Sequence, residues 1–220
     1  MSVQALSLAF PQPLAEKYRP RRIEDFIGLD KPRRILGRFC ANPFPSAWLF
    51  VGPSGTGKTS MALALTEQLP AELHHIPSKN CDLATVENVC RQCHYSPRTF
   101  DGWKPWPFHL VLVDEADSMS STAQMAFLSK LDATAFPPAT IFVFTCNATT
   151  NLEARFLSRC RVIEFSSYGM NGPISELLER VWTAETAGTG ESPNFSRIAK
   201  EANNNMRDAL MSLEMELMSL

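Results

Sequence analysis

Five short, mostly apolar runs along the first three quarters of the chain predict the strands of a buried parallel sheet. They carry few polar residues, as strands do when helices cover both faces of a sheet. The runs are residues 47–51, 73–76, 109–113, 140–146 and 161–165. Apolar residues spaced three and four apart, or runs of helix-forming residues, predict the helices that alternate with these strands. Those helices are residues 31–40, 61–69, 82–94, a segment that Ser120 or Ser121 caps, and a short turn at 152–157.

The pattern changes after residue 166, where strand signals stop. Residues 173–183, 194–202 and 206–220 predict three more helices. We therefore expect two domains. Residues 1–165 would form an α/β domain in which helices sandwich a five-stranded parallel sheet, and residues 166–220 would form a small helical domain.

Composition places the chain among ordinary globular proteins, since 45% of its 220 residues are hydrophobic and 20% are charged. No apolar run approaches the ~18 residues that a membrane helix needs. The N-terminus has no basic segment followed by a full apolar one, so we expect no signal peptide and no membrane partner. The sequence thus predicts a soluble cytoplasmic protein.

A basic segment between residues 17 and 38 leaves two interpretations open, because the net charge of −2 neither indicates nor excludes a nucleic-acid partner. The segment could face DNA phosphates, or it could be a solvated surface. Only three acidic residues oppose its eight basic ones. The basic residues are Lys17, Arg19, Arg21, Arg22, Lys31, Arg33, Arg34 and Arg38.

Six cysteines without an export signal make a disulfide framework unexpected. Cys90 and Cys93, with Cys81 nearby, have a spacing that zinc sites use. Both fall on the apolar face of the helix predicted at 82–94, so we expect core packing and not zinc. The loop at 96–108 is rich in Pro and Trp. We interpret Trp103, Trp106 and Phe108 as packing anchors, with a contact surface as the alternative.

Residues 52–59 fit the G-x-x-x-x-G-K-[ST] pattern of a phosphate-binding loop, and the predicted strand and helix flank it as that loop requires. Its glycines let backbone N–H groups turn toward phosphate oxygens, and the helix N-terminus adds partial positive charge. Lys58 would reach the β- and γ-phosphates, and the Thr59 hydroxyl would bind Mg²⁺. The expected nucleotide-binding residues are Gly52, Pro53, Ser54, Gly55, Thr56, Gly57, Lys58, Thr59 and Ser60.

Asp114 and Glu115 follow the strand at 109–113 and form the second nucleotide motif. An Asp at a strand end beside a phosphate loop can hold Mg²⁺ through water. The adjacent Glu115 is placed to activate the attacking water. Two solvated acids are the alternative. With the phosphate loop present, the sequence predicts an ATPase that uses ATP and Mg²⁺.

The chain resembles the clamp-loader branch of the AAA+ ATPases over nearly its whole length. Residues 114–117 also spell the motif that names a helicase family, but the downstream sequence fits clamp loaders better. The matching stretches are residues 16–20, 23–28, 114–119, 123–126, 142–147, 158–160 and 205–210. The resemblance implies a P-loop NTPase (AAA+) fold followed by a helical lid.

The resemblance also implies roles for residues far from the phosphate loop. Asn147 would orient the attacking water or touch the γ-phosphate, and Arg207 would reach that phosphate from the lid. Arg159 would act as an arginine finger in the ATP site of a neighbouring subunit. Tyr18 and Arg19 would lie near the adenine and ribose. Ordinary turn, surface and salt-bridge roles are the alternatives.

Two departures from the family pattern bear on partners. Bacterial relatives often carry a four-cysteine zinc module before the second strand, whereas these cysteines come after it. Family members usually continue into a collar domain, whereas this chain stops at the lid. The collar is then absent or supplied elsewhere, or the ring closes differently.

The resemblance implies an ATP-hydrolysing subunit that assembles with other AAA+ subunits, in a homo- or hetero-oligomer, and loads a sliding clamp on primed DNA. A helicase loader or branch-migration motor is one alternative. A nucleotide-gated scaffold with little turnover is another.

Overall fold

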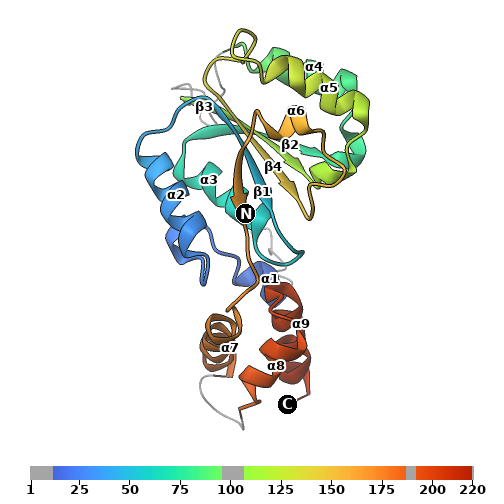
Figure 1. Ribbon diagram of the computed structural model, residues 1–220. Coiled ribbons are helices and arrows are strands. Elements are labelled where there is room, and N and C mark those ends of the chain that lie inside the picture. The colour runs from blue at the N-terminus through green and yellow to red at the C-terminus, as the bar shows by residue number, and fades with distance from the viewer. Residues whose placement is uncertain (1–11, 96–106, 187–191, 220) are drawn as a thin grey trace, which may run out of the picture.

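The structure is a computed structural model that describes residues 12–95, 107–186 and 192–219. The predicted loop residues Trp103 and Trp106 lie outside these ranges. Figure 1 shows a sheet with helices on both faces and, beneath it, a group of helices that contains the C-terminus.

A parallel five-stranded sheet forms the centre of the larger part, with the strand order β2-β3-β4-β1-β5. The strands coincide with the five predicted runs to within two residues at each end. All seven residues of the fourth strand are buried, as its apolar run predicts. The strands are β1 (Ser46–Val51), β2 (Ala71–Pro77), β3 (Phe108–Asp114), β4 (Thr140–Cys146) and β5 (Arg161–Glu164). The five-stranded parallel sheet predicted from the sequence is confirmed.

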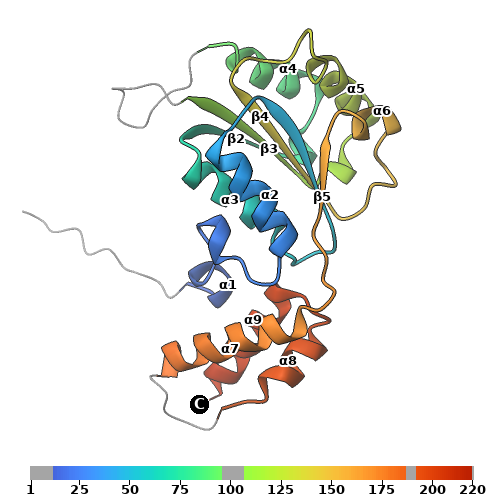
Figure 2. The same ribbon diagram turned by 60° about the vertical axis from the view of Figure 1, so that its left-hand side comes forward.

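Helices cover both faces because successive strand residues point in opposite directions. Leu49 of β1 packs in one core with α4 (Leu83–Gln92), α5 (Ser121–Lys130) and α6 (Ala154–Leu157). Its neighbour Phe50 packs in the opposite core with α2 (Asp30–Ala41) and α3 (Lys58–Gln68). Figure 2 shows these two groups of helices on either side of the sheet. Short 3₁₀ turns at Ile23–Asp25, Ser78–Asn80 and Ala116–Ser118 connect the elements.

The helical part has a core of its own, formed by α7 (Asn171–Thr186), α8 (Phe195–Glu201) and α9 (Met206–Met218). The N-terminal helix α1 (Leu14–Lys17) joins this core, because Leu14 is buried in it and its N–H donates to Glu214 Oε1 at 3.1 Å. The division at residues 165 and 166 stays a prediction. The structure adds that the two ends of the described chain meet in the helical part.

The cysteines are all free thiols, and Cys81, Cys90 and Cys93 are buried in the core between the sheet and α4. Burial raises the pKa of the Cys90 thiol to about 11. The burial predicted for Cys90 and Cys93 is therefore confirmed. Across the described ranges, no helix combines the length and the apolarity needed to cross a membrane.

Candidate nucleotide site

The loop between β1 and α3 has the backbone conformation that its glycines predict. Gly55 and Gly57 have φ values of 73° and 90°, in the left-handed region of backbone conformation that residues other than glycine rarely adopt. Gly57 directly precedes α3, so the free N–H groups of the helix start face the end of the loop. This combination of turn and helix N-terminus is suited to an anion such as a phosphate.

Lys58 lies across the loop with its ammonium group held by oxygen atoms. Its Nζ donates to the carbonyls of Gly52 at 2.7 Å and Pro53 at 2.8 Å, and to Asn147 Oδ1 at 3.1 Å. The residue is only 8% exposed. Burial lowers the pKa of Lys58 below its usual value, although nearby acidic groups oppose this shift. Phosphate oxygens at this point would favour the charged form of Lys58.

Asp114, at the end of β3, forms hydrogen bonds with one residue of α3 and one residue of β4. Its Oδ1 accepts from the Thr59 hydroxyl at 2.8 Å and also from the Thr145 hydroxyl. A hydroxyl and a carboxylate are the hard oxygen donors that Mg²⁺ prefers. Neighbouring ligands of an octahedral Mg²⁺ lie about 2.9 Å apart when each bond is about 2.0–2.1 Å. The Thr59 and Asp114 oxygens thus fit the metal in chemistry and in separation.

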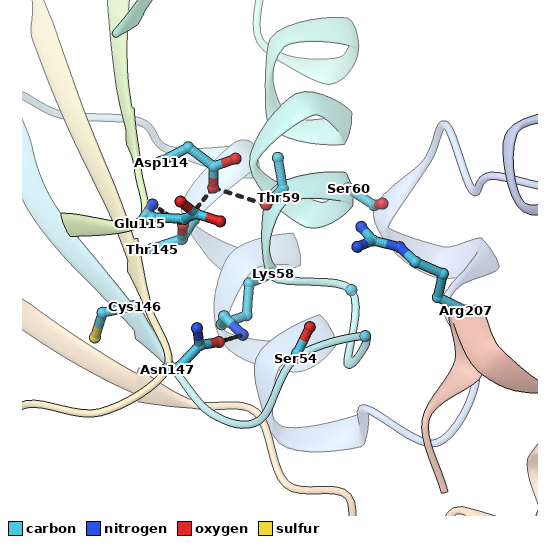
Figure 3. A pocket seen from close by; sticks show the side chains of 12 residues that line it. Ser54, Lys58, Thr59, Ser60, Asp114, Glu115, Thr145, Cys146, Asn147 and Arg207 are labelled. Atoms are coloured by element: carbon cyan, nitrogen blue, oxygen red, sulfur yellow. Dashed lines mark hydrogen bonds between the residues drawn. The ribbon is translucent and has the colours of Figure 1, made fainter. Parts of the chain in front are cut away.

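Glu115 has a left-handed backbone conformation, with φ 56° and ψ 48°. This conformation costs a residue other than glycine about 1–3 kcal/mol and is concentrated at functional sites. Its N–H donates to Thr145 Oγ1 at 3.1 Å, which anchors the turn. Figure 3 shows the Glu115 carboxylate beside Asp114 at the strand ends, and both residues line the pocket.

Asn147 follows the end of β4 and is held on two sides. Its side-chain oxygen accepts from Lys58, and its backbone N–H donates to Asp117 Oδ2 at 3.1 Å. The amide is therefore oriented toward the phosphate loop by residues from two other segments of the chain. Figure 3 shows the hydrogen bond that joins Asn147 and Lys58.

The helical part contributes Arg207, whose side chain extends from α9 toward the phosphate loop in Figure 3. Asn205 caps the same helix, with its Oδ1 accepting from the N–H groups of Arg207 at 3.0 Å and Asp208 at 3.3 Å. This cap lies against the loop, because a Cβ added to Gly55 would be 1.7 Å from Asn205 Oδ1. Two side chains of one helix start thus connect the helical part to the phosphate loop.

The structure gathers most of the predicted site residues in one pocket. Those that line it are Ser54, Gly55, Gly57, Lys58, Thr59, Ser60, Asp114, Glu115, Asn147 and Arg207. Thr145 and Cys146 also line it and were not predicted. The predicted residues Gly52, Pro53 and Thr56 are not among the described residues that line the pocket, and the Thr56 hydroxyl donates to the Pro53 carbonyl at 2.8 Å. The signal in the sequence that could have identified Thr145 is a polar residue near the end of an otherwise apolar strand.

Arg159 lies away from the pocket, on the surface beside α6. Its Nη1 donates to the Arg155 carbonyl at 3.0 Å, and its Nη2 lies 3.3 Å from Asp132 Oδ2. It is not among the described residues that line the pocket. Its action as an arginine finger stays a prediction.

Tyr18 and Arg19 likewise are not among the described residues that line the pocket. Tyr18 packs against the helical core, and its hydroxyl bonds with the Glu185 carboxylate. Burial, with help from Glu185, raises the pKa of Tyr18 to about 12. Arg19 pairs with Glu16 one turn before it. Contact of these two residues with adenine and ribose stays a prediction.

Comparison with known proteins identifies the family of the chain. Residues 48–168 match the family described as "ATPase family associated with various cellular activities (AAA)". The replication factor C small subunit of Picrophilus torridus is 33% identical over 158 residues, which are 68% of this chain and 47% of that protein. Replication factor C subunit 2 of Saccharomyces cerevisiae is 29% identical over 76% of this chain and 50% of that protein. The chain thus spans about half the length of these relatives.

Among solved structures, the Thermotoga maritima RuvB Holliday junction branch migration motor matches with a TM-score of 0.73. The match covers 92% of this chain and 65% of the RuvB chain, at 18% sequence identity. At this identity, the likeness shows a shared fold, and it confirms the P-loop fold expected from the sequence.

Proposed function

Because the chain belongs to the AAA family of ATPases, within which it resembles the clamp-loader type, we propose that it binds and hydrolyses ATP as a subunit of a clamp loader. The observation that carries this proposal is the convergence of Lys58, Thr59, Asp114 and Asn147 from three separate strand ends. A buried cation and a paired hydroxyl and carboxylate are what a triphosphate with its metal ion requires.

The triphosphate binds along residues 52–60, with backbone N–H groups and the start of α3 facing its oxygens. Lys58 exchanges its carbonyl partners for the β- and γ-phosphates, which favours its charged form. Thr59 and Asp114 would hold Mg²⁺, which would supply positive charge to neutralise the charge that develops on the phosphates.

Hydrolysis is phosphoryl transfer to water. The water oxygen forms a bond to the γ-phosphorus, and the bond from that phosphorus to the β–γ bridging oxygen breaks to release ADP. Glu115 accepts the proton of the water, and Asn147 orients the water or the γ-phosphate. Catalysis is mostly positioning and stabilisation of charge.

The site is shared between subunits in this proposal. Arg159 faces away from its own pocket and reaches the ATP of a neighbour, where such a residue is worth about 10³–10⁵ in rate. Arg207 contacts the γ-phosphate from the helical part, so that part responds to which nucleotide is bound. ATP binding and hydrolysis then drive binding and release of a partner.

A sliding clamp on primed DNA is the proposed partner, because relatives that match along most of the chain are replication factor C subunits. Four basic residues between positions 17 and 38 have no acidic partner within ion-pair distance among the described residues. They are available to DNA phosphates. These residues are Arg21, Lys31, Arg34 and Arg38.

Turnover assays with three variants test the proposal. Lys58→Ala is expected to abolish ATP binding, and Glu115→Gln is expected to bind ATP without hydrolysing it. Arg159→Ala is expected to bind normally and turn over slowly, and mixing it with Glu115→Gln is expected to restore activity. Normal ATP affinity of Lys58→Ala would refute the assignment of the phosphate loop. Failure of rescue in a demonstrated mixed oligomer would refute action in trans.

The clamp is tested separately, by turnover with and without primed DNA and the clamp. Stimulation by both together is expected. If neither primed DNA nor the clamp changes the rate of turnover, the proposed clamp-loading role is refuted, whereas the proposed ATPase activity is not. ATP binding with no turnover under any of these conditions would instead indicate a nucleotide-gated scaffold.

A further inference from the structure

Three potential metal ligands meet at the end of the sheet opposite the nucleotide site. They are His74 of β2, Cys93 after the end of α4, and His109 of β3. One ligand atom from each lies within 4.8 Å of those of the other two. Cys93 and His109 are each 1% exposed, and His74 is partly exposed. Neither histidine has a role in the proposed ATPase.

Strand register explains why these residues face one another. Glu72 of β2 is paired with His109 of β3, and His74 lies two residues further along β2 on the same face. His109 shares its face of β3 with Val111, which packs in the core that contains Cys93. Both histidines therefore point toward the end of α4.

The hydrogen bonds give His109 the tautomer that a metal ligand needs. Its Nε2 lies 2.9 Å from the Tyr95 carbonyl oxygen, which can only accept, so this nitrogen carries the proton. Its Nδ1 is then the atom with a lone pair, and it lies 3.0 Å from His74 Nε2. Metal-binding histidines typically donate the other ring N–H to a carbonyl in this way.

The Glu72 carboxylate lies beside one of the three ligands. Glu72 Oε2 lies 3.4 Å from His109 Nδ1, on the same side of the imidazole as His74. Two imidazoles, a thiolate and a carboxylate or water form a four-coordinate set of the kind that binds zinc. Softer thiolate and imidazole ligands disfavour Mg²⁺ and Ca²⁺.

We propose that His74, Cys93 and His109 bind one zinc ion, which ties β2 and β3 to the end of α4. Without metal, the two histidines would share a hydrogen bond in which His74 Nε2 donates to His109 Nδ1. On metal binding the His74 proton moves to Nδ1, which leaves the Nε2 lone pair free to bind, and the Cys93 thiol releases its proton to solvent. The ligands bind zinc as a thiolate and neutral imidazoles, and protons compete with the metal for both. Zinc affinity should therefore weaken as the pH falls.

The proposed zinc site is separate from the nucleotide pocket. His109 and Asp114 lie at opposite ends of β3, five residues and thus about 16 Å apart. Zinc binding and ATP binding can accordingly be measured independently, and this inference does not rest on the proposed function.

The test is a metal titration of the full chain after removal of metal with a chelator. Zn²⁺ in competition with a coloured chelator is expected to bind with one equivalent, and Co²⁺ is expected to give a thiolate-to-cobalt charge-transfer band. Cys93→Ala and His109→Asn should each weaken zinc binding by about 100-fold or more. Cys90→Ala, from the same core, and His75→Asn, from the exposed face of β2, are the matched controls and should bind as the wild type does.

Two outcomes would overturn the proposal. One is wild-type protein that takes up no stoichiometric zinc. The other is a Cys93→Ala variant, folded by circular dichroism, that binds zinc and Co²⁺ as the wild type does. If the His109→Asn variant fails to fold, zinc binding by the wild type and by Cys93→Ala still decides the test. As a further check, zinc should raise the melting temperature of the wild type and not that of Cys93→Ala.

Discussion

Gly55→Ala tests the contact between the helical part and the phosphate loop. Gly55 has a φ of 73°, and a Cβ built on it would lie 1.7 Å from Oδ1 and 2.3 Å from Cγ of Asn205. Both separations are far below any that real Cβ atoms show, so the Asn205 side chain must move away. The substitution therefore strains the loop and removes the N-cap of α9 at the same time.

The expected cost is the sum of these two effects. An alanine in the left-handed region costs about 1–2 kcal/mol. Displacing Asn205 removes its bonds to the Arg207 and Asp208 N–H groups, and loss of an N-cap costs about 1 kcal/mol. We expect Gly55→Ala to lower the free energy of unfolding by roughly 2–3 kcal/mol.

Urea unfolding followed by circular dichroism, without nucleotide, measures this loss. The matched control is Gly37→Ala. Gly37 lies inside α2 and would have no atom within 4 Å of an added Cβ, so alanine should stabilise the protein by about 0.5–1 kcal/mol. A Gly55→Ala variant within about 0.5 kcal/mol of the wild type would refute the reasoning.

A double-mutant cycle separates the two effects. Asn205→Ala alone should cost about 1 kcal/mol through the lost cap. In the double variant the clash is relieved and the cap is already gone, so the total should stay at roughly 2–3 kcal/mol. Strict additivity would show that the two residues do not touch.

Three further predictions follow from other parts of the structure. Tyr18 keeps its proton in the folded state up to about pH 12, against a usual pKa of 10.0, so stability should fall as pH rises through this interval. Tyr18→Phe should abolish that fall in urea midpoints, and an unchanged pH dependence would contradict the burial of its hydroxyl beside Glu185. Asp114→Asn should reduce the gain in ATP affinity on adding Mg²⁺ by about tenfold or more, and a full Mg²⁺ effect would argue against Asp114 as a metal-holding residue. Arg207→Gln should weaken ATP binding about tenfold or more while leaving ADP binding nearly unchanged. The surface variant Arg197→Gln is its control, and equal losses for ATP and ADP would count against a contact with the γ-phosphate.

The sequence by itself determined the features that depend on neighbouring residues. Apolar runs predicted all five strands, because burial on both faces leaves little room for polar residues. The phosphate loop was readable because its glycines, Lys58 and Thr59 are adjacent along the chain. Asp114 and Glu115 were readable because they directly follow a buried strand. The order and spacing of the later motifs led to the resemblance with clamp loaders, and the comparisons support it.

Only the tertiary structure decided contacts between distant segments. The bond between Lys58 and Asn147 and the contact between Gly55 and Asn205 depend on which strand ends and helix starts come together. The helix at Leu14–Lys17 packs in the helical part because apolar surface is available there, which no local pattern encodes.

The cysteine motif shows the same limit most clearly. The spacing of Cys90 and Cys93 suggested a local metal motif, and helical periodicity argued for core packing. Strand register instead brings His74 and His109, 35 residues apart, to Cys93 alone. Helix and strand periods are local, whereas register and packing are fixed by the burial of the whole sheet, so this cluster could be found only in the folded chain.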